Sequence, residues 1–115
     1  MRADMGLSPQ QLQVITDILT TAVPSIEQVK VFGSRSTGRF RPQSDLDLVI
    51  YGSIDDSLCD HLWTLFGDSN LPFGVDLKNY RTIDYQPLKD HIDAVARPLL
   101  VRRGSHLRPV CEQAG

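Results

Sequence analysis

The segment FGSRSTGRFRPQSDLD, residues 32–47, joins a Gly-Ser turn to two carboxylates ten residues further on. The apolar run QVKVF precedes Gly33, and Asp45 and Asp47 begin a second run with alternating apolar positions. Side chains at positions i and i+2 of a strand point to the same face, about 6.5–7 Å apart. A glycine in such a turn lets backbone N–H groups approach a phosphate. Together these features predict a site for a metal-bound nucleotide.

The acidic residues of this segment have the chemistry of magnesium ligands. Neighbouring carboxylates on one face repel each other unless a cation lies between them, and Mg²⁺ prefers oxygen ligands. We expect Asp45 and Asp47 to hold two Mg²⁺ ions about 3.5–4 Å apart, and the Ser34 hydroxyl to donate to a terminal phosphate oxygen. Asp76, on the polar face of a predicted strand, would share one metal and accept a proton from an incoming hydroxyl. Any one of these residues alone would be read as a turn or a surface carboxylate.

The pattern of apolar residues predicts an α/β (α+β) domain with a small mixed sheet. Helices are expected after Ser8, which can act as an N-cap, over residues 55–66, and after Asp84, which can cap the last helix; apolar positions recur at helical spacing in each of them. We expect these helices on one face of the sheet and the aspartates on the other. The predicted strands cover residues 28–32, 45–51 and 75–79, with a short extended segment at 99–101 and a loop that can include a helical turn at 34–42.

Length and composition limit the classes of function. A chain of 115 residues predicts a single domain, over residues 1–101, followed by a poorly ordered tail over residues 102–115. A net charge of −2 argues against a general nucleic-acid binder, and no apolar run approaches the roughly 18–20 residues that span a bilayer. The N-terminal segment lacks the apolar core of a secretion signal. Cys59 and Cys111 show no metal-binding or disulfide-dense spacing, so a cytoplasmic protein is expected.

The stretch GSRSTGRFRPQSDLDL closely resembles the signature of the polymerase-β-like nucleotidyltransferase superfamily, in which Gly-Ser is followed after ten residues by Asp-x-Asp. The chain looks most like the minimal nucleotidyltransferase (MNT) antitoxins of HEPN/MNT toxin–antitoxin pairs, over residues 12–101. The resemblance implies the superfamily fold. It also implies that the turn formed by Gly33, Ser34 and Arg35 binds the triphosphate of ATP. The carboxylates of Asp45, Asp47 and Asp76 would then form the metal-binding catalytic triad.

The resemblance further implies a protein partner. Antitoxins of this kind neutralise a HEPN ribonuclease encoded beside them, some by transferring AMP from ATP to a tyrosine of that toxin, as in type VII-like pairs. One position departs from the pattern: Thr37 stands where relatives often carry a basic residue. Arg35, Arg39 or Arg41 would have to supply that charge near the triphosphate.

Two alternatives remain open at the level of sequence. The chain could neutralise its partner by binding alone, without catalysis. It could also modify a small hydroxylated antibiotic or an RNA end, although the chain shows no second domain to hold such an acceptor. Trp63 lies off the main apolar stripe of its predicted helix, and we interpret it as a candidate contact with a partner protein.

Overall fold

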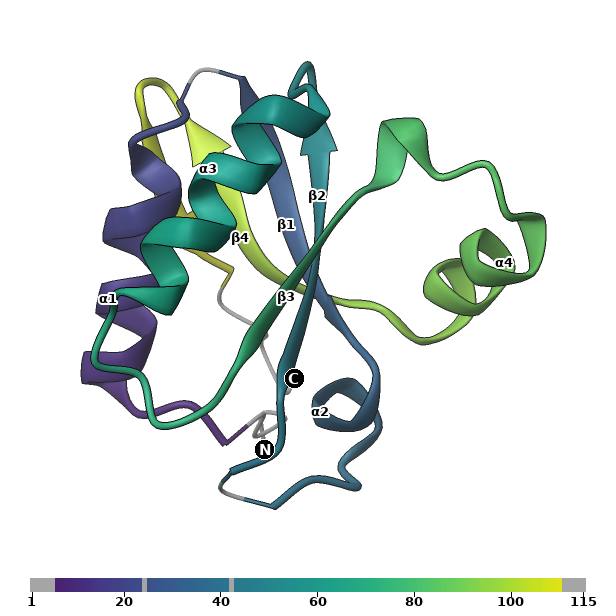
Figure 1. Ribbon diagram of the computed structural model, residues 1–115, viewed down its shortest axis with the longest axis horizontal. Coiled ribbons are helices and arrows are strands. Elements are labelled where there is room, and N and C mark those ends of the chain that lie inside the picture. The colour runs from purple at the N-terminus through teal and green to yellow at the C-terminus, as the bar shows by residue number, and fades with distance from the viewer. Residues whose placement is uncertain (1–5, 24, 42, 111–115) are drawn as a thin grey trace.

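The computed structural model describes residues 6–23, 25–41 and 43–110. Helices and strands alternate around one five-stranded sheet (Figure 1). The helices are α1 (Pro9–Thr20), α2 (Ser34–Thr37), α3 (Asp56–Gly67), the short 3₁₀ helix η1 (Tyr80–Thr82) and α4 (Gln86–Val95). The strands are β1 (Ile26–Phe32), β2 (Leu46–Gly52), β3 (Val75–Asn79), β4 (Arg97–Arg103) and β5 (His106–Pro109).

The sheet has the order β3-β2-β1-β4-β5, with β2 and β3 parallel and the other neighbours antiparallel. The predicted mixed sheet is therefore confirmed. Because β2 and β3 run in the same direction, their N-terminal ends lie at the same edge of the sheet. Residues at the start of β2 therefore lie beside residues at the start of β3. This pairing decides where the acidic side chains meet.

Two helices begin within one residue of the positions that the sequence predicts. At α1, the Ser8 hydroxyl accepts from the backbone N–H of Gln11 at 3.1 Å, and the Gln11 side chain accepts from the Ser8 backbone N–H at 2.9 Å. At α3, the Asp55 side chain accepts from the Leu58 backbone N–H at 2.8 Å. The prediction that Asp84 caps the last helix is wrong, because α4 starts one residue later and its N-cap, Tyr85, makes no side-chain capping bond.

The two faces of the sheet have separate apolar clusters. On one face, α1 and α3 cover the sheet through a core that includes Ile15, Leu48 and Leu62, all fully buried. On the other face, α4 packs its buried Ile92 against Phe32 and Val49, and it lies on the opposite side of the sheet from α1 and α3 (Figure 1). The expectation that all helices pack on one face is therefore wrong for α4. α4 packs on the opposite face because Phe32 and Val49 form an apolar patch there, and α4 removes that patch from water.

The C-terminal part also differs from the prediction. Residues 102–109, expected in a poorly ordered tail, complete β4 and form β5, while residues 111–115 lie outside the described ranges. Gly104, with a φ of 64°, and Ser105 form the two-residue turn of a hairpin in which Arg103 pairs with His106. Leu107 of β5 is buried in the main core, which explains why this strand is ordered. Among helices in the described ranges, none combines the length and hydropathy needed to cross a membrane.

Candidate active site

Gly33 joins β1 to α2 in a conformation that other residues avoid. Its φ is 76° and its ψ is −153°, a region that is essentially limited to glycine. A Cβ at this position would collide with Oδ2 of Asp47. The absence of a side chain at residue 33 therefore allows a carboxylate of the next strand to lie directly against this turn.

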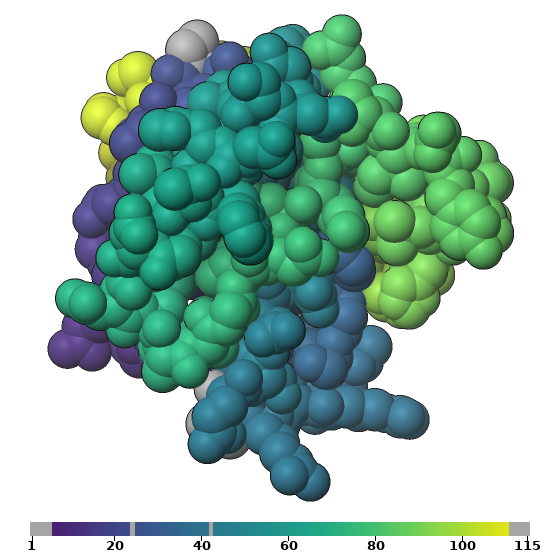
Figure 2. All heavy atoms as spheres, viewed as in Figure 1, coloured from purple at the N-terminus to yellow at the C-terminus, as the bar shows by residue number. Residues whose placement is uncertain are grey.

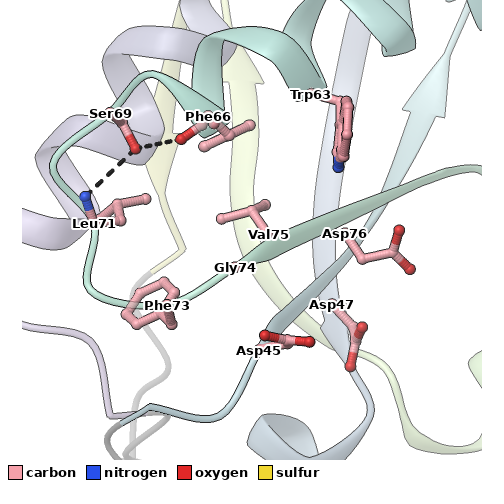
Figure 3. Close-up of a pocket in the computed structure, with 11 residues that line it drawn as sticks. Asp45, Asp47, Trp63, Phe66, Ser69, Leu71, Phe73, Gly74, Val75 and Asp76 are labelled. Atoms are coloured by element: carbon pink, nitrogen blue, oxygen red, sulfur yellow. Dashed lines mark hydrogen bonds between the residues drawn. The ribbon is translucent and has the colours of Figure 1, made fainter.

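The parallel pairing of β2 with β3 brings the acids together. Asp47 of β2 pairs with Asp76 of β3, and both side chains leave the face of the sheet opposite to that of their buried neighbours Leu46 and Val75. Asp45 lies just before β2 and against Gly74, the residue before β3. A Cβ built on Gly74 would be 2.9 Å from Oδ1 of Asp45. All three carboxylates line one pocket (Figure 3).

The charges of this cluster oppose one another. The pKa of Asp47 is raised above its usual value, first because burial disfavours the charged form and then because Asp76 and Asp45 repel it. Lys78 acts in the opposite direction, and its Nζ lies 3.5 Å from Oδ2 of Asp76. Both members of this ion pair are exposed to solvent, so breaking it would cost little free energy.

The donor set fits a divalent cation. Within the part of the chain that the structure describes, no three His, Cys, Asp or Glu side chains already converge as metal ligands would. The three carboxylates nevertheless share one pocket, and the pKa of Asp47 is raised by burial and then by repulsion from Asp76 and Asp45, which a bound cation would relieve. Carboxylate oxygens without nitrogen or sulfur ligands suit Mg²⁺ rather than zinc. The metal role of Asp45, Asp47 and Asp76 stays a prediction that this geometry permits.

Arg35 lies in a place that the sequence does not reveal. Its side chain is only 1% exposed, and its Nε and Nη2 donate to the backbone oxygen of Ser44 at 3.2 and 2.9 Å. The guanidinium also lies over the rings of Phe40 and Phe73, at 5.1 and 4.4 Å from their centroids. Burial lowers the pKa of Arg35. Arg35 thus supports the loops that deliver Asp45 and β3, and the nucleotide contact expected of it stays a prediction.

The surface of the α2–β2 loop carries the remaining candidates for phosphate binding. Thr37 is exposed, and its hydroxyl donates to the backbone oxygen of Ser34 at 3.2 Å. Arg39 and Arg41 are exposed on the same loop, which projects at the bottom of the space-filling view (Figure 2). These two arginines are exposed and therefore available to meet an anionic ligand.

A cavity of about 500 Å³ continues from the carboxylates toward α3. Its wall is formed by the C-terminal half of α3, the loop over residues 67–74 and the start of β3 (Figure 3). Trp63, with 60% of its surface exposed, is the largest apolar side chain on this wall. The sequence marks Trp63 as exposed, but it gives no sign that the side chain shares a cavity with the acids.

Comparisons with known proteins identify the family of this chain. Residues 13–103 match the family described as polymerase beta, nucleotidyltransferase. The "probable protein adenylyltransferase MntA" of Haemophilus influenzae is 35% identical over 82 residues, which cover 70% of this chain and 71% of that protein.

Solved structures share the fold at low sequence identity. A toxin–antitoxin complex crystallised with AMP-PNP superposes with a TM-score of 0.63 at 21% identity, over 76% of this chain and 70% of that chain. A mutant of the MntA–HpeT toxin–antitoxin gives 0.61 at 21% identity, over 76% and 69%. A nucleotidyltransferase candidate from Sulfolobus solfataricus gives 0.51 at 17% identity, over 84% and 86%. With the family match over residues 13–103 and the relative at 35% identity, the chain belongs to the polymerase-β nucleotidyltransferase family and is a nucleotidyltransferase.

Proposed function

We propose that this nucleotidyltransferase is an antitoxin that transfers AMP from ATP to a hydroxyl group, a tyrosine in our reading, of a HEPN-type ribonuclease toxin and so neutralises it. The observation that carries the proposal is the pocket in which Asp45, Asp47 and Asp76 lie beside the Gly33 turn. Support for the chemistry and the partner comes from the relative named as a protein adenylyltransferase and from the toxin–antitoxin complexes with the same fold. Since the reaction needs ATP, we propose a cytoplasmic location.

The three acids and the turn have separate roles in this proposal. Asp45, Asp47 and Asp76 would hold two Mg²⁺ ions, which when bound supply positive charge to the phosphates of ATP. The Ser34 hydroxyl donates to an oxygen of the leaving pyrophosphate, and the Gly33 turn keeps the Asp47 carboxylate close to that group. The exposed arginines of the α2–β2 loop, Arg39 and Arg41, add charge at the triphosphate.

The transfer itself is a displacement at phosphorus. The acceptor oxygen forms a bond to the α-phosphorus, and the bond from that phosphorus to the pyrophosphate oxygen breaks. The acceptor loses its proton to Asp76, and pyrophosphate leaves with the electron pair of the broken bond. A phosphodiester between AMP and the acceptor side chain remains.

The test uses the purified chain with ATP, Mg²⁺ and the product of the neighbouring gene. We expect the mass of that partner to increase by one or more AMP units, and its toxicity in cells to fall. Asp45→Asn should abolish both effects, because it removes a charged oxygen ligand while leaving the shape of the residue. Asp60→Asn, an exposed position on α3 away from the pocket, is the matched control and should behave as the parent chain does.

The alternatives give distinct results in the same experiment. If no AMP appears on the partner and Asp45→Asn protects cells as well as the parent, the chain is an antitoxin that acts by binding alone. If AMP is transferred to a small hydroxylated antibiotic or to an RNA end without any protein partner, the chain is an enzyme of another substrate class. Either result would contradict the proposed function.

A further inference from the structure

We propose that the cavity between α3, the loop over residues 67–74 and β3 receives the acceptor side chain, and that Trp63 binds it. We call this cavity the acceptor pocket. The inference rests on the proposed function and adds to it the place and the chemistry of acceptor recognition. The occupant to which we commit is a tyrosyl side chain of the partner protein, with its ring against Trp63 and its hydroxyl toward Asp76.

The direction of the reaction places the acceptor on this side. In an in-line displacement the attacking oxygen approaches from the side opposite to the leaving group. The leaving pyrophosphate is assigned to the turn at Gly33 and Ser34, next to α2. Figure 3 shows α2 below Asp45 and Asp47, with Asp76 and then Trp63 on the other side of these carboxylates. An attacking hydroxyl therefore enters from the side of Trp63.

The lining of the acceptor pocket matches an aromatic side chain with a polar tip. Its wall away from the acids includes the apolar side chains of Phe66, Leu71 and Phe73 beside Ser69, while Asp47 and Asp76 lie at the other end. An aliphatic or aromatic body would pack against the apolar wall, and a hydroxyl would face the carboxylates. A purely polar acceptor such as a sugar would leave that apolar wall without a partner.

Trp63 has the exposure of a binding residue rather than of a core residue. Its surface is 60% exposed, whereas Leu62 is fully buried and Phe66 is 5% exposed on the same helix. The end of the indole ring that carries the nitrogen points toward the part of the acceptor pocket that Asp76 lines (Figure 3). Tryptophan is strongly enriched among residues that dominate binding at protein interfaces, and aromatic pairs add specific attraction to buried area. β3 is the edge strand of the described sheet, so no further strand of that sheet closes off this side.

A kinetic experiment separates the two substrates. With the neighbouring toxin as acceptor, Trp63→Ala should raise KM for the toxin by about 10- to 30-fold, the usual effect of removing an aromatic anchor. KM for ATP should stay unchanged, and Trp63→Phe should restore KM for the toxin to within about 5-fold of the parent value. His61→Ala, an exposed position on α3 outside the acceptor pocket, is the control and should change neither constant.

A rise in KM for ATP alone would mean that the cavity holds the nucleotide base, and no change in either constant would mean that Trp63 binds neither substrate. Both results would overturn the proposal.

A binding experiment decides the inference independently of catalysis. Trp63 is the single tryptophan of the chain, so its fluorescence reports on this cavity alone. We expect N-acetyl-tyrosinamide to change the Trp63 emission in a saturable way, and N-acetyl-alaninamide to leave it unchanged. If the parent chain transfers no AMP to the toxin, the proposed function fails while this titration still tests the acceptor pocket. An emission that responds equally to both amides, or to neither, would contradict the acceptor pocket even if AMP transfer occurs.

Discussion

Replacing Gly33 with alanine tests how closely the turn and the acid must approach each other. The backbone of Gly33 has a φ of 76° and a ψ of −153°, and forcing another residue into that region costs about 1–3 kcal/mol. The new Cβ would also meet Oδ2 of Asp47, so either the turn or the carboxylate must move. Because a misplacement of about 1 Å can cost about 100-fold in rate, we expect AMP transfer to fall by about 100-fold or more.

Gly38 provides the matched control for this change. It also has a positive φ, 82°, but a Cβ built on it meets nothing within 4 Å. Gly38→Ala should therefore cost about 1–2 kcal/mol of stability through backbone strain alone and leave the rate of transfer near that of the parent. The assays are urea unfolding and AMP transfer to the toxin. If Gly33→Ala keeps the parent rate, or if both variants lose the same amount of activity, the close approach of Asp47 to the turn has no role in catalysis.

Three further predictions concern the acid, the buried arginine and the buried thiol. Because the pKa of Asp47 is raised in the fold, the protonated form of this carboxyl favours the folded state. This contribution to stability is complete below the usual carboxyl pKa and is lost as pH rises through the raised value. Asp47→Asn should thus increase the thermal stability at neutral pH while removing activity, and a lower melting temperature would contradict the repulsion described above. Arg35→Lys keeps the charge but loses the paired donors to Ser44, so unfolding in urea should show a loss of about 1–3 kcal/mol, against at most about 0.5 kcal/mol for exposed Arg39→Lys. Burial and nearby aspartates raise the pKa of Cys59 to about 11, so in a Cys111→Ser variant the remaining thiol should react with iodoacetamide only in denaturant. Rapid alkylation of the folded variant, followed by mass spectrometry, would show that this thiol is accessible.

Much of the site was accessible from local sequence patterns. The alternation of Leu46 and Leu48 with Asp47 assigns the acid to the face away from the core, and the same alternation around Asp76 does so on β3. If two short strands with this pattern pair in parallel, their two acids lie on the same face of the sheet. The cap at Ser8 was predictable from the local sequence, since the bond that it makes joins residues three apart.

The differences from the prediction come from contacts between residues far apart in the chain. The burial of Arg35 was not predicted, because its guanidinium lies over the ring of Phe73, from the loop before β3, as well as over the ring of the nearby Phe40. The position of α4 depends on an apolar patch shared by β1 and β2, whose members Phe32 and Val49 look like ordinary strand residues in the sequence. The β5 strand contains one buried apolar residue, Leu107, so its periodic signal is too weak to recognise.

Label transfer from ATP to the toxin, by the parent chain and by Asp76→Asn, tests nucleotidyl transfer by the three acids most directly. We expect label at the α-phosphate to be transferred and label at the γ-phosphate not to be, and we expect transfer to require Mg²⁺. Removing the proton acceptor should lower the rate by about 100-fold or more, whereas Asp60→Asn should not change it. Transfer of the γ-label, or an Asp76→Asn variant as fast as the parent, would contradict the assignment of the three acids to nucleotidyl transfer.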